Sequence, residues 1–461
     1  AAEQRVCLVT DSAQPSFLYT RTSALFPALQ PVPAEDFPFL PDCAAAAGAA
    51  LQQITLPDWL PEAVLLEART LSQRCTYSFT AMRPEAVRAL YGRTIPLSAS
   101  KIDRFAGCRY AFFLQYGLRA APWKQAEFDA PLFGSFVHDV LEHVVRAAQE
   151  NGGFAAMTDG EISALTERCM DACMGTYLPQ GEAAASRERY LSARNRQEAA
   201  AVVMDVAREL RLSQFAPAAE ELRFAPGGPL PPIEYRAKSG SGLLTGQIDR
   251  VDIYEADGTR YFRIIDYKTG HKDFDYAELL YGKNLQMLLY LFALESYQKQ
   301  TGQPMQPAGV LYVPGRCDMV KLKPGEDPAH ADNERRKDLR RKGLVLNDEA
   351  VLHAMESYEK KPQYLPFEHG PDGLAGDLAS PAQLAELERF VTGQVESMID
   401  EILSGVTAPN PINRGPSDTE CKYCDFSSAC HKDVCSVNTR RFASVTPEEF
   451  WQELERRLEH G

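Results

Sequence analysis

The chain has 461 residues, enough for two or three domains, and its 45% hydrophobic and 24% charged residues are typical of an ordinary globular protein. No apolar run is as long as a membrane span, and the sequence does not open with the basic and apolar segments of a secretory signal, so we expect a cytoplasmic protein. The net charge of −14 argues against a broad nucleic-acid surface, although it does not exclude a local positive patch.

The first half of the chain is predicted to be mainly helical after a mixed region, residues 1–95. Ser100 and Asp103 have the spacing of a capping box, which predicts the start of a new unit. Helices are expected over 60–71, 105–116, 132–150 and 160–215. There is no G-x-x-x-x-G-K-[ST] motif, so we expect no P-loop nucleotide site.

Beyond a Pro/Gly-rich linker at 226–232 the pattern changes to strands. Two β-rich runs, 243–254 and 261–268, are joined by a turn that predicts a hairpin. A helix over 284–298 and a strand over 309–313 follow, and this alternation predicts an α/β core. We expect charged loops over 320–380, a helix over 384–404, and a terminal helix over 451–458 that opens with a capping box at Thr446-Pro-Glu-Glu449.

Two acids and a lysine lie on the two strands of the expected hairpin. Asp266 and Lys268 are two residues apart, so they project from the same face of one strand, and Asp249 comes from the neighbouring strand. Carboxylates with open positions beside them suit Mg²⁺ or Mn²⁺, and Lys268 would face a phosphate. The alternative is a hairpin salt bridge. Asp252 is three residues from Asp249, so we expect it to face the opposite side.

Other side chains are candidates for the same site. His138 lies within Gly134-x-x-x-His138-x-x-Leu-Glu142, where Glu142 alternatively pairs with it on the helix. Glu220 or Glu221, just before the hairpin, would complete a metal site or simply be exposed. Gln286 and Tyr290 share a helix face, where they would contact the substrate or Lys268, or cap the core.

A basic run, Arg335-Arg-Lys-Asp-Leu-Arg-Arg-Lys342, has six bases in eight residues. Its two interpretations are a solvated surface and a contact with DNA. The candidate substrate contacts in it are Arg335, Arg336, Arg340 and Arg341.

Of eleven cysteines, Cys421, Cys424 and Cys430 form a tight triplet, which indicates a metal site one ligand short of four. The candidates for the fourth ligand are Cys108, Cys435, Cys169 and Cys173, with His431 a further one for zinc. Spacing alone favours Cys435. Cys169 and Cys173 are expected to be buried helix cysteines, and the remaining four (Cys7, Cys43, Cys75 and Cys317) ordinary ones.

Taken together, these motifs resemble the RecB-family nucleases of the PD-(D/E)XK class from about residue 97 to residue 435. The likeness begins with Leu97-Ser-Ala-Ser-Lys-Ile-Asp-Arg-Phe-Ala-Gly-Cys108 and includes Glu221-Leu-Arg-Phe224, Gly246-Gln-Ile-Asp249-Arg-Val-Asp and Asp266-Tyr-Lys268-Thr-Gly. It implies a restriction-endonuclease-like α/β core, a mixed central sheet flanked by helices, with helical insertions.

The resemblance also implies the roles of the site residues. It implies that His138, Glu221, Asp249 and Asp266 are metal ligands, that Lys268 is catalytic and that Gln286 supports it. It implies a [4Fe–4S] cluster that joins the two ends of the domain and is held by Cys108, Cys421, Cys424 and Cys430. Such a crosslink would remove roughly 5–6 kcal/mol of unfolded-chain entropy in the loop-closure model.

The resemblance implies three regions and one activity. Residues 1–95 would be the tail of an upstream helicase-like region, 96–435 the nuclease domain and 436–461 a helical extension. The expected activity is Mg²⁺-dependent hydrolysis of single-stranded DNA from helicase-unwound ends. The expected role is double-strand-break resection and recombinational repair, and the expected partner is a helicase–nuclease of the AddA type in a heterodimer. The alternatives are a stand-alone iron–sulfur exonuclease of the CRISPR-associated type and a non-catalytic DNA-binding or subunit-docking module.

Overall fold

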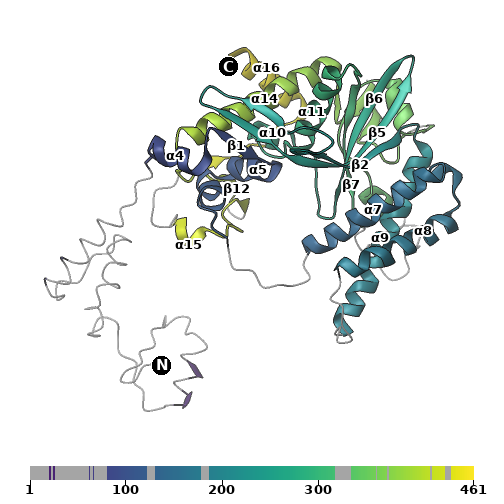
Figure 1. Ribbon diagram of the computed structural model, residues 1–461, viewed down its shortest axis with the longest axis horizontal. Helices are drawn as coiled ribbons and strands as arrows, with labels where there is room; N and C mark the ends of the chain where they lie inside the picture. Colours follow the sequence, from purple (N-terminus) through teal and green to yellow (C-terminus); the bar gives the residue numbers. More distant parts are fainter. Residues whose placement is uncertain are drawn as a thin grey trace. The chain divides into compact units, whose positions relative to one another are not determined.

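The computed structural model describes residues 80–121, 130–177, 186–316, 334–359, 361–370, 373–415, 418–430 and 438–460, with isolated positions 20, 21, 24, 25, 62 and 66. The chain divides into two units, Ala1–Ser78 with His431–Ser436, and Phe79–Cys430 with Val437–Gly461. The second unit contains the elements labelled in Figure 1. The helix expected over 60–71, apart from positions 62 and 66, lies outside the described residues, as do Cys7, Cys43, Cys75, Cys317, His431 and Cys435.

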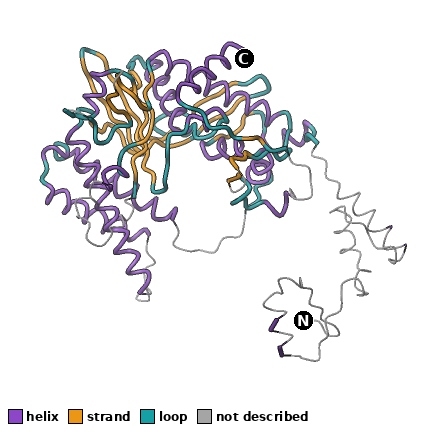
Figure 2. Tube along the Cα trace, turned by 180° about the vertical axis from the view of Figure 1, so that it is seen from behind, coloured by secondary structure: helices purple, strands orange, loops and turns teal. Residues whose placement is uncertain are grey.

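A mixed sheet of six strands is the centre of this unit, in the order β11-β8-β7-β6-β5-β2. Its strands are β2 (Ala216–Phe224), β5 (Gly246–Ala256), β6 (Thr259–Lys268), β7 (Gln306–Pro314), β8 (Lys342–Leu346) and β11 (Leu378–Ala379). The β6–β7 and β8–β11 pairs are parallel and the others antiparallel. Seen from behind, the strands lie between helices on both sides (Figure 2). The predicted α/β core with a mixed, helix-flanked sheet is confirmed.

The predicted hairpin is formed by β5 and β6. Asp257 and Gly258 form its two-residue turn with φ of 51° and 74°, a left-handed pair that the Asp-Gly sequence favours. The run predicted as one strand over 243–254 is divided in two, because β4 (Ser241–Leu244) belongs to a separate, three-stranded sheet whereas β5 pairs with β2 and β6. Thr245 lies between the two strands.

Helix α11 (Gln286–Gln300) connects β6 to the parallel strand β7. Residues 287–292 are all buried, on every side of the helix. This is expected of a crossover helix that is covered by sheet on one side and by other helices on the other. The predicted helix over 284–298 is therefore confirmed, two residues further along.

Three helices precede the sheet: α7 (Ala130–Glu150), α8 (Asp159–Tyr177) and α9 (Ser186–Leu212). They pack on one another, and α7 contacts β2 at the sheet edge (Figure 1). The predicted stop after α7 is confirmed, since Gly152 and Gly153 have φ of 86° and 84°. At the start of α7, a Cβ on Gly134 would lie 3.1 Å from Thr269 Oγ1, so the helix approaches the end of β6 closely.

A three-stranded sheet, β1 (Thr94–Leu97), β4 and β3 (Ile233–Arg236), packs with α14 (Pro381–Leu403). The helix after β1 is α5 (Ala99–Gly107), and the prediction of a capping box at Ser100 is wrong. Helix α5 begins at Ala99, so Ser98 is its N-cap and accepts from Lys101 N at 3.3 Å. Asp103 instead accepts from the backbone N–H of Asn284 at 2.8 Å.

Helix α16 (Pro447–His460) is capped as predicted by reciprocal bonds between Thr446 and Glu449. Phe450 and Leu454 are fully buried, and the helix contacts α14 and α10 (Tyr276–Leu280). The last residues thus belong to the same core as the sheet.

The described part of the region 320–380, which begins at residue 334, is less irregular than expected, because β8 and β11 extend the central sheet. The other elements are α4 (Pro84–Tyr91), α6 (Arg109–Phe112), η2 (Phe113–Gly117), η3 (Phe154–Ala156), α13 (Glu349–Met355), β9 (Phe367–Gly370), β10 (Gly373–Gly376), β12 (Ile412–Gly415), β13 (Asp418–Thr419), α15 (Ser427–Cys430) and β14 (Arg440–Arg441). Among the described residues, no helix combines the length and the apolar character needed to cross a bilayer.

Candidate metal centre

The hairpin opens where the two predicted acids stand. Counted from the turn, the last paired residues of β5 and β6 are Arg250 and Ile265. The next residue outward on each strand is Asp249 on β5 and Asp266 on β6. The Oδ2 atom of Asp249 accepts the backbone N–H of Tyr267 at 2.8 Å. The carboxylate of Asp249 thus bonds a backbone donor at the point where the strand ladder ends.

Glu221 reaches the same place from the edge strand β2. Its neighbours Glu220 and Leu222 pair with Arg250 and Ile248, so Glu221 stands opposite Asp249. Its φ of 49° is a left-handed conformation that costs a non-glycine residue on the order of 1 kcal/mol or more. Between the two glutamates that the sequence left open, the geometry favours Glu221.

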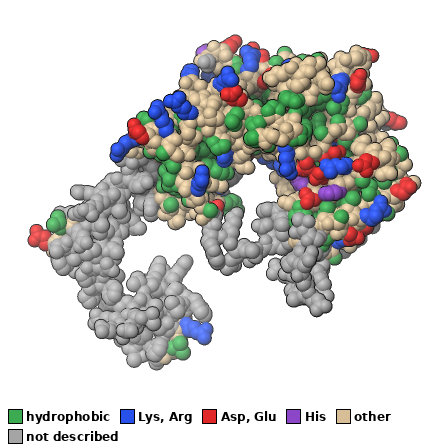
Figure 3. Space-filling model, viewed as in Figure 1, with side chains coloured by type: hydrophobic (Ala, Val, Ile, Leu, Met, Phe, Trp, Pro, Cys, Tyr) green, Lys and Arg blue, Asp and Glu red, His purple; other side chains and the backbone are tan. Residues whose placement is uncertain are grey.

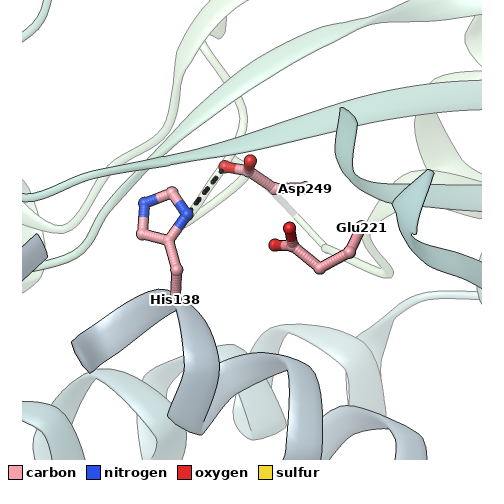
Figure 4. Close-up of side chains that lie close together, drawn as sticks. All are labelled: His138, Glu221 and Asp249. Atoms are coloured by element: carbon pink, nitrogen blue, oxygen red, sulfur yellow. Dashed lines mark ion pairs between the residues drawn. The ribbon is translucent and has the colours of Figure 1, made fainter. Parts of the chain in front are cut away.

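His138 completes this cluster from helix α7. Its Nδ1 lies 3.4 Å from Asp249 Oδ2, and its Nε2 lies 2.8 Å from the carbonyl oxygen of Tyr267. One ligand atom from each of His138, Glu221 and Asp249 lies within 4.8 Å of the others. All three side chains turn toward one another (Figure 4). Glu142 does not pair with His138; it accepts from Arg146 at 2.5 Å.

Asp266 and Lys268 form an ion pair beside the cluster, with Lys268 Nζ 2.5 Å from Asp266 Oδ2. This pair lies within one strand and includes a single, buried acid, so it is not the hairpin salt bridge of two surface acids with the lysine that was the alternative. Asp266 is only 3% exposed and lies outside the group of three. The structure therefore brings three of the four predicted ligands together and holds the fourth against the predicted catalytic lysine.

The electrostatics of the site fit a bound cation. Burial and the charge of Asp249 raise the pKa of Glu221 to about 7 and that of Asp266 to about 6. Burial alone would lower the pKa of His138, but the hydrogen bond and charge of Asp249 raise it to about 9. Carboxylates that suppress one another's ionisation, beside an imidazole, form a donor set that a divalent cation would stabilise. Acidic, basic and histidine side chains gather on this face, over α7 and the adjoining sheet (Figure 3).

Binding of Mn²⁺ is expected to strengthen with pH. His138 and Glu221 hold protons below pKa values of about 9 and about 7, and a cation must displace those protons. Between pH 8.5 and pH 6.5 we expect the affinity to fall by about 100-fold, because one displaced proton per ion changes affinity about tenfold per pH unit. Calorimetric titration with Mn²⁺ at several pH values measures this, and an affinity that is constant with pH would contradict it.

Tyr290 is not a substrate contact. It is 3% exposed and stacks on Phe224 with the ring centres 5.8 Å apart. Its hydroxyl is hydrogen-bonded to the backbone of Gln247 and the side chain of Gln286. A Cβ on Gly246 would lie 1.9 Å from that hydroxyl oxygen, which explains the glycine at the start of β5. The core-capping alternative is the correct one for Tyr290.

Most of the basic run is turned inward or bonded to the protein. Arg341 is fully buried and pairs with Asp205 at 2.5 Å and Glu209 at 2.7 Å, so its prediction as a substrate contact is wrong. The guanidinium of Arg340 donates to the carbonyl oxygen of Leu365 at 2.8 Å and pairs with Glu368. Arg335 and Arg336 are exposed.

Behind the hairpin lies a charge cluster that sequence reasoning missed: Arg250, Asp252, Arg263, Glu209, Asp205 and Arg341. Asp252 accepts from Arg250 Nε at 2.7 Å and from Arg263 Nε at 2.9 Å. Arg263 Nη2 lies 3.2 Å from Glu209 Oε1. The expectation that Asp252 faces away from the metal site is confirmed. The only signal in the sequence was that Arg250 and Asp252 alternate with Asp249 along one strand.

The cysteines of the predicted cluster meet around a small apolar group formed by Tyr110, Ala111, Leu114 and Phe426. Cys108, Cys424 and Cys430 all pack against it. Cys421 lies in the same turn as Cys424, whose N–H donates to its carbonyl oxygen at 3.3 Å. On α8, Cys173 is buried and Cys169 half-buried, and burial raises both thiol pKa values.

A sequence model described as the PD-(D/E)XK nuclease superfamily matches residues 96–431. The chain belongs to this superfamily, as the motifs around Asp249 and Lys268 predicted.

Curated relatives are B-type subunits of ATP-dependent helicase/deoxyribonucleases. The chain is 32% identical to that of Acetivibrio thermocellus over 357 residues, which are 76% of this chain and 31% of the relative. It is 30% identical to that of Caldanaerobacter subterraneus subsp. tengcongensis over 357 residues (75% and 30%), and 29% identical to that of Clostridioides difficile over 361 residues (75% and 31%). The chain spans about a third of the length of these relatives.

Proposed function

We propose that this chain is the nuclease region of an AddB-type protein and hydrolyses phosphodiester bonds of single-stranded DNA with Mg²⁺. The observation that carries the proposal is the cluster of His138, Glu221 and Asp249 beside the Asp266–Lys268 pair, in a chain of the PD-(D/E)XK superfamily.

In this proposal His138, Glu221 and Asp249 hold the cation, with Asp266 beside them. The cation would polarise the scissile phosphate and lower the pKa of a bound water. The ammonium group of Lys268, held by Asp266, would stabilise the negative charge that develops on the phosphate oxygens. Gln286 would act indirectly, through the Tyr290 hydroxyl and the start of β5.

The wider role follows from the names of the relatives, which are helicase/deoxyribonuclease subunits. A protein named as one subunit of a larger enzyme implies a partner, so we propose a heterodimer with a helicase–nuclease of the AddA type. The unwound single strand at a duplex end would be the substrate, in double-strand-break resection and recombinational repair in the cytoplasm. Residues 1–95 would then belong to an upstream region, 96–435 to the nuclease domain and 436–461 to an extension docked through α16.

The test is cleavage of a fluorescent single-stranded oligonucleotide and of a blunt hairpin duplex of the same sequence. We expect cleavage of the single strand with Mg²⁺ or Mn²⁺, slower cleavage of the duplex without a helicase partner, and none in EDTA. Cleavage that persists in EDTA, or no cleavage with either metal, would contradict a metal-dependent nuclease activity of this chain.

We also propose a [4Fe–4S] cluster on Cys108, Cys421, Cys424 and Cys430. The support is the shared apolar group around which three of these cysteines pack although they come from distant parts of the chain. A further bond joins the same two segments: Tyr110 Oη donates to the carbonyl of Ala429 at 3.4 Å. Arg440, ten residues beyond Cys430, also donates to the carbonyls of Ala106 and Gly107 beside Cys108.

The double substitution Cys421→Ser, Cys424→Ser is expected to remove the iron and to destabilise the domain by up to roughly 5–6 kcal/mol, since loop-closure entropy is then restored to the unfolded chain. Anaerobic purification, iron quantification and urea unfolding measure both effects. Cys169→Ser, on the half-buried position of α8, is the control and should keep iron and stability. An iron-free wild type, or a double variant as stable as wild type, would contradict the cluster.

A further inference from the structure

One residue connects the candidate metal centre to the charge cluster behind it. Tyr267 donates its N–H to Asp249 at 2.8 Å, and its carbonyl oxygen lies 2.8 Å from His138 Nε2. Its ring also packs edge-on against the His138 ring, with centres 5.9 Å apart. The backbone and ring of Tyr267 therefore contact two of the three residues that would hold the cation.

The far end of Tyr267 is held by a buried charge. Arg250 Nη1 donates to the Tyr267 hydroxyl at 2.7 Å, and the guanidinium lies 5.7 Å from the ring centre. Arg250 is itself fixed by two bonds to Asp252, at 2.7 and 3.0 Å, and both residues are fully buried. Each of the three guanidinium nitrogens of Arg250 thus donates one hydrogen bond, and a movement of this buried group would leave a donor unsatisfied.

We infer that Tyr267 and Arg250 are positioning residues of the metal centre: their buried hydroxyl–guanidinium bond fixes the peptide that orients Asp249 and His138. This inference rests on the proposed function. The charge cluster thus contributes to the affinity for the cation as well as to the stability of the fold. Groups that orient metal ligands from outside are typically worth about 10–100-fold in metal affinity.

The chain provides a matched pair of tyrosines for the test. Tyr267→Phe removes only the hydroxyl that Arg250 bonds. Tyr364→Phe is the control: Tyr364 is also buried and packs on Arg341 of the same charge cluster, 4.5 Å from the guanidinium carbon to the ring centre. Both variants remove a phenol hydroxyl from a buried tyrosine that packs on an arginine of the charge cluster, but of the two tyrosines only Tyr267 contacts His138 and Asp249.

Two readouts are needed: the dissociation constant for Mn²⁺ by calorimetry in the absence of DNA, and the midpoint of thermal unfolding. We expect about tenfold weaker Mn²⁺ binding for Tyr267→Phe, wild-type binding for Tyr364→Phe, and similar unfolding midpoints for the two. Arg250→Lys, which keeps the charge but not the Nη1 bond, should weaken Mn²⁺ binding as Tyr267→Phe does.

Failure of the inference and failure of the proposed function give different results. If Asp249→Asn weakens Mn²⁺ binding while Tyr267→Phe binds like wild type, or no more weakly than Tyr364→Phe, the positioning role is excluded and the metal site stands. If wild type and Asp249→Asn bind Mn²⁺ equally, there is no cation at this site, and both proposals fall.

Discussion

Replacing Asp249 by asparagine is expected to reduce Mg²⁺-dependent cleavage of single-stranded DNA by about 1,000-fold or more. A bound cation contributes several kcal/mol to the transition state, and each 1.4 kcal/mol is a factor of ten in rate. Lys268→Ala should lose about 100- to 1,000-fold, as for one donor to a developing negative charge. Rates are to be measured under single-turnover conditions with excess enzyme.

The loss in Asp249→Asn should not come from unfolding. An asparagine oxygen can still accept the Tyr267 N–H, and the substitution removes the charge that raises the pKa of Glu221 and Asp266. It also removes the ion pair with His138, and this loss opposes the gain from the removed charge, so we expect an unfolding midpoint close to that of wild type. Glu220→Gln, on the same strand as Glu221 but outside the cluster, is the control and should cleave nearly as wild type does. Equal cleavage by Asp249→Asn and wild type would exclude the catalytic assignment.

Replacing Glu209 by alanine is expected to destabilise the domain by about 3–5 kcal/mol, as is typical when one partner of a buried ion pair is removed. The substitution removes one of the two carboxylates that each of Arg341 and Arg263 pairs with, so two fully buried guanidinium groups lose part of their charge compensation. Urea unfolding followed by circular dichroism measures the effect. Glu453→Ala is the control, because its pairs with Arg456 and Arg457 lie on the surface of α16 and should be worth less than about 1 kcal/mol. A loss no larger than that of the control would contradict the structural role of the charge cluster.

The pKa of Glu209 also predicts the pH range in which acid destabilises the fold. Burial alone would raise the pKa of Glu209, but the charges of Arg341, Arg263 and Arg250 lower it from 4.5 to about 2. A lowered carboxyl pKa gives stability above the unfolded value, and this is lost as the pH falls from about 4.5 to 2. We expect stability to decrease with acid over that range in wild type, with a smaller slope in Glu209→Gln.

The acids of the hairpin could be predicted because their placement depends on local geometry. The alternation of side chains along a strand places Asp266 and Lys268 together, and the Asp257-Gly258 turn sets the pairing that brings Asp249 beside them. His138 and Glu221 could be assigned only through the family resemblance. The left-handed backbone of Glu221 depends on how β2 meets β5, which no pattern within β2 reveals.

The charge cluster could not be predicted, because its partners come from distant elements. Nothing around Asp205 and Glu209 on α9 indicates that they meet Arg341, which precedes β8. A count of bases in 335–342 measures charge and not burial, so it gave Arg341 the same weight as the exposed Arg336. A sequence pattern indicates which side of a single helix or strand is buried, whereas pairing between side chains of different elements depends on the tertiary fold.

The close approach of Tyr290 to Gly246 makes these two positions interdependent in evolution. A methyl group at position 246 would overlap the phenol ring as well as its hydroxyl, since a Cβ there would lie 2.5 Å from the ring carbon that bears the oxygen. A relative that carries alanine at 246 should therefore have a smaller side chain at 290, and it would lose the bond to the Gln247 backbone with it. Covariation of the two sites across relatives would record this constraint.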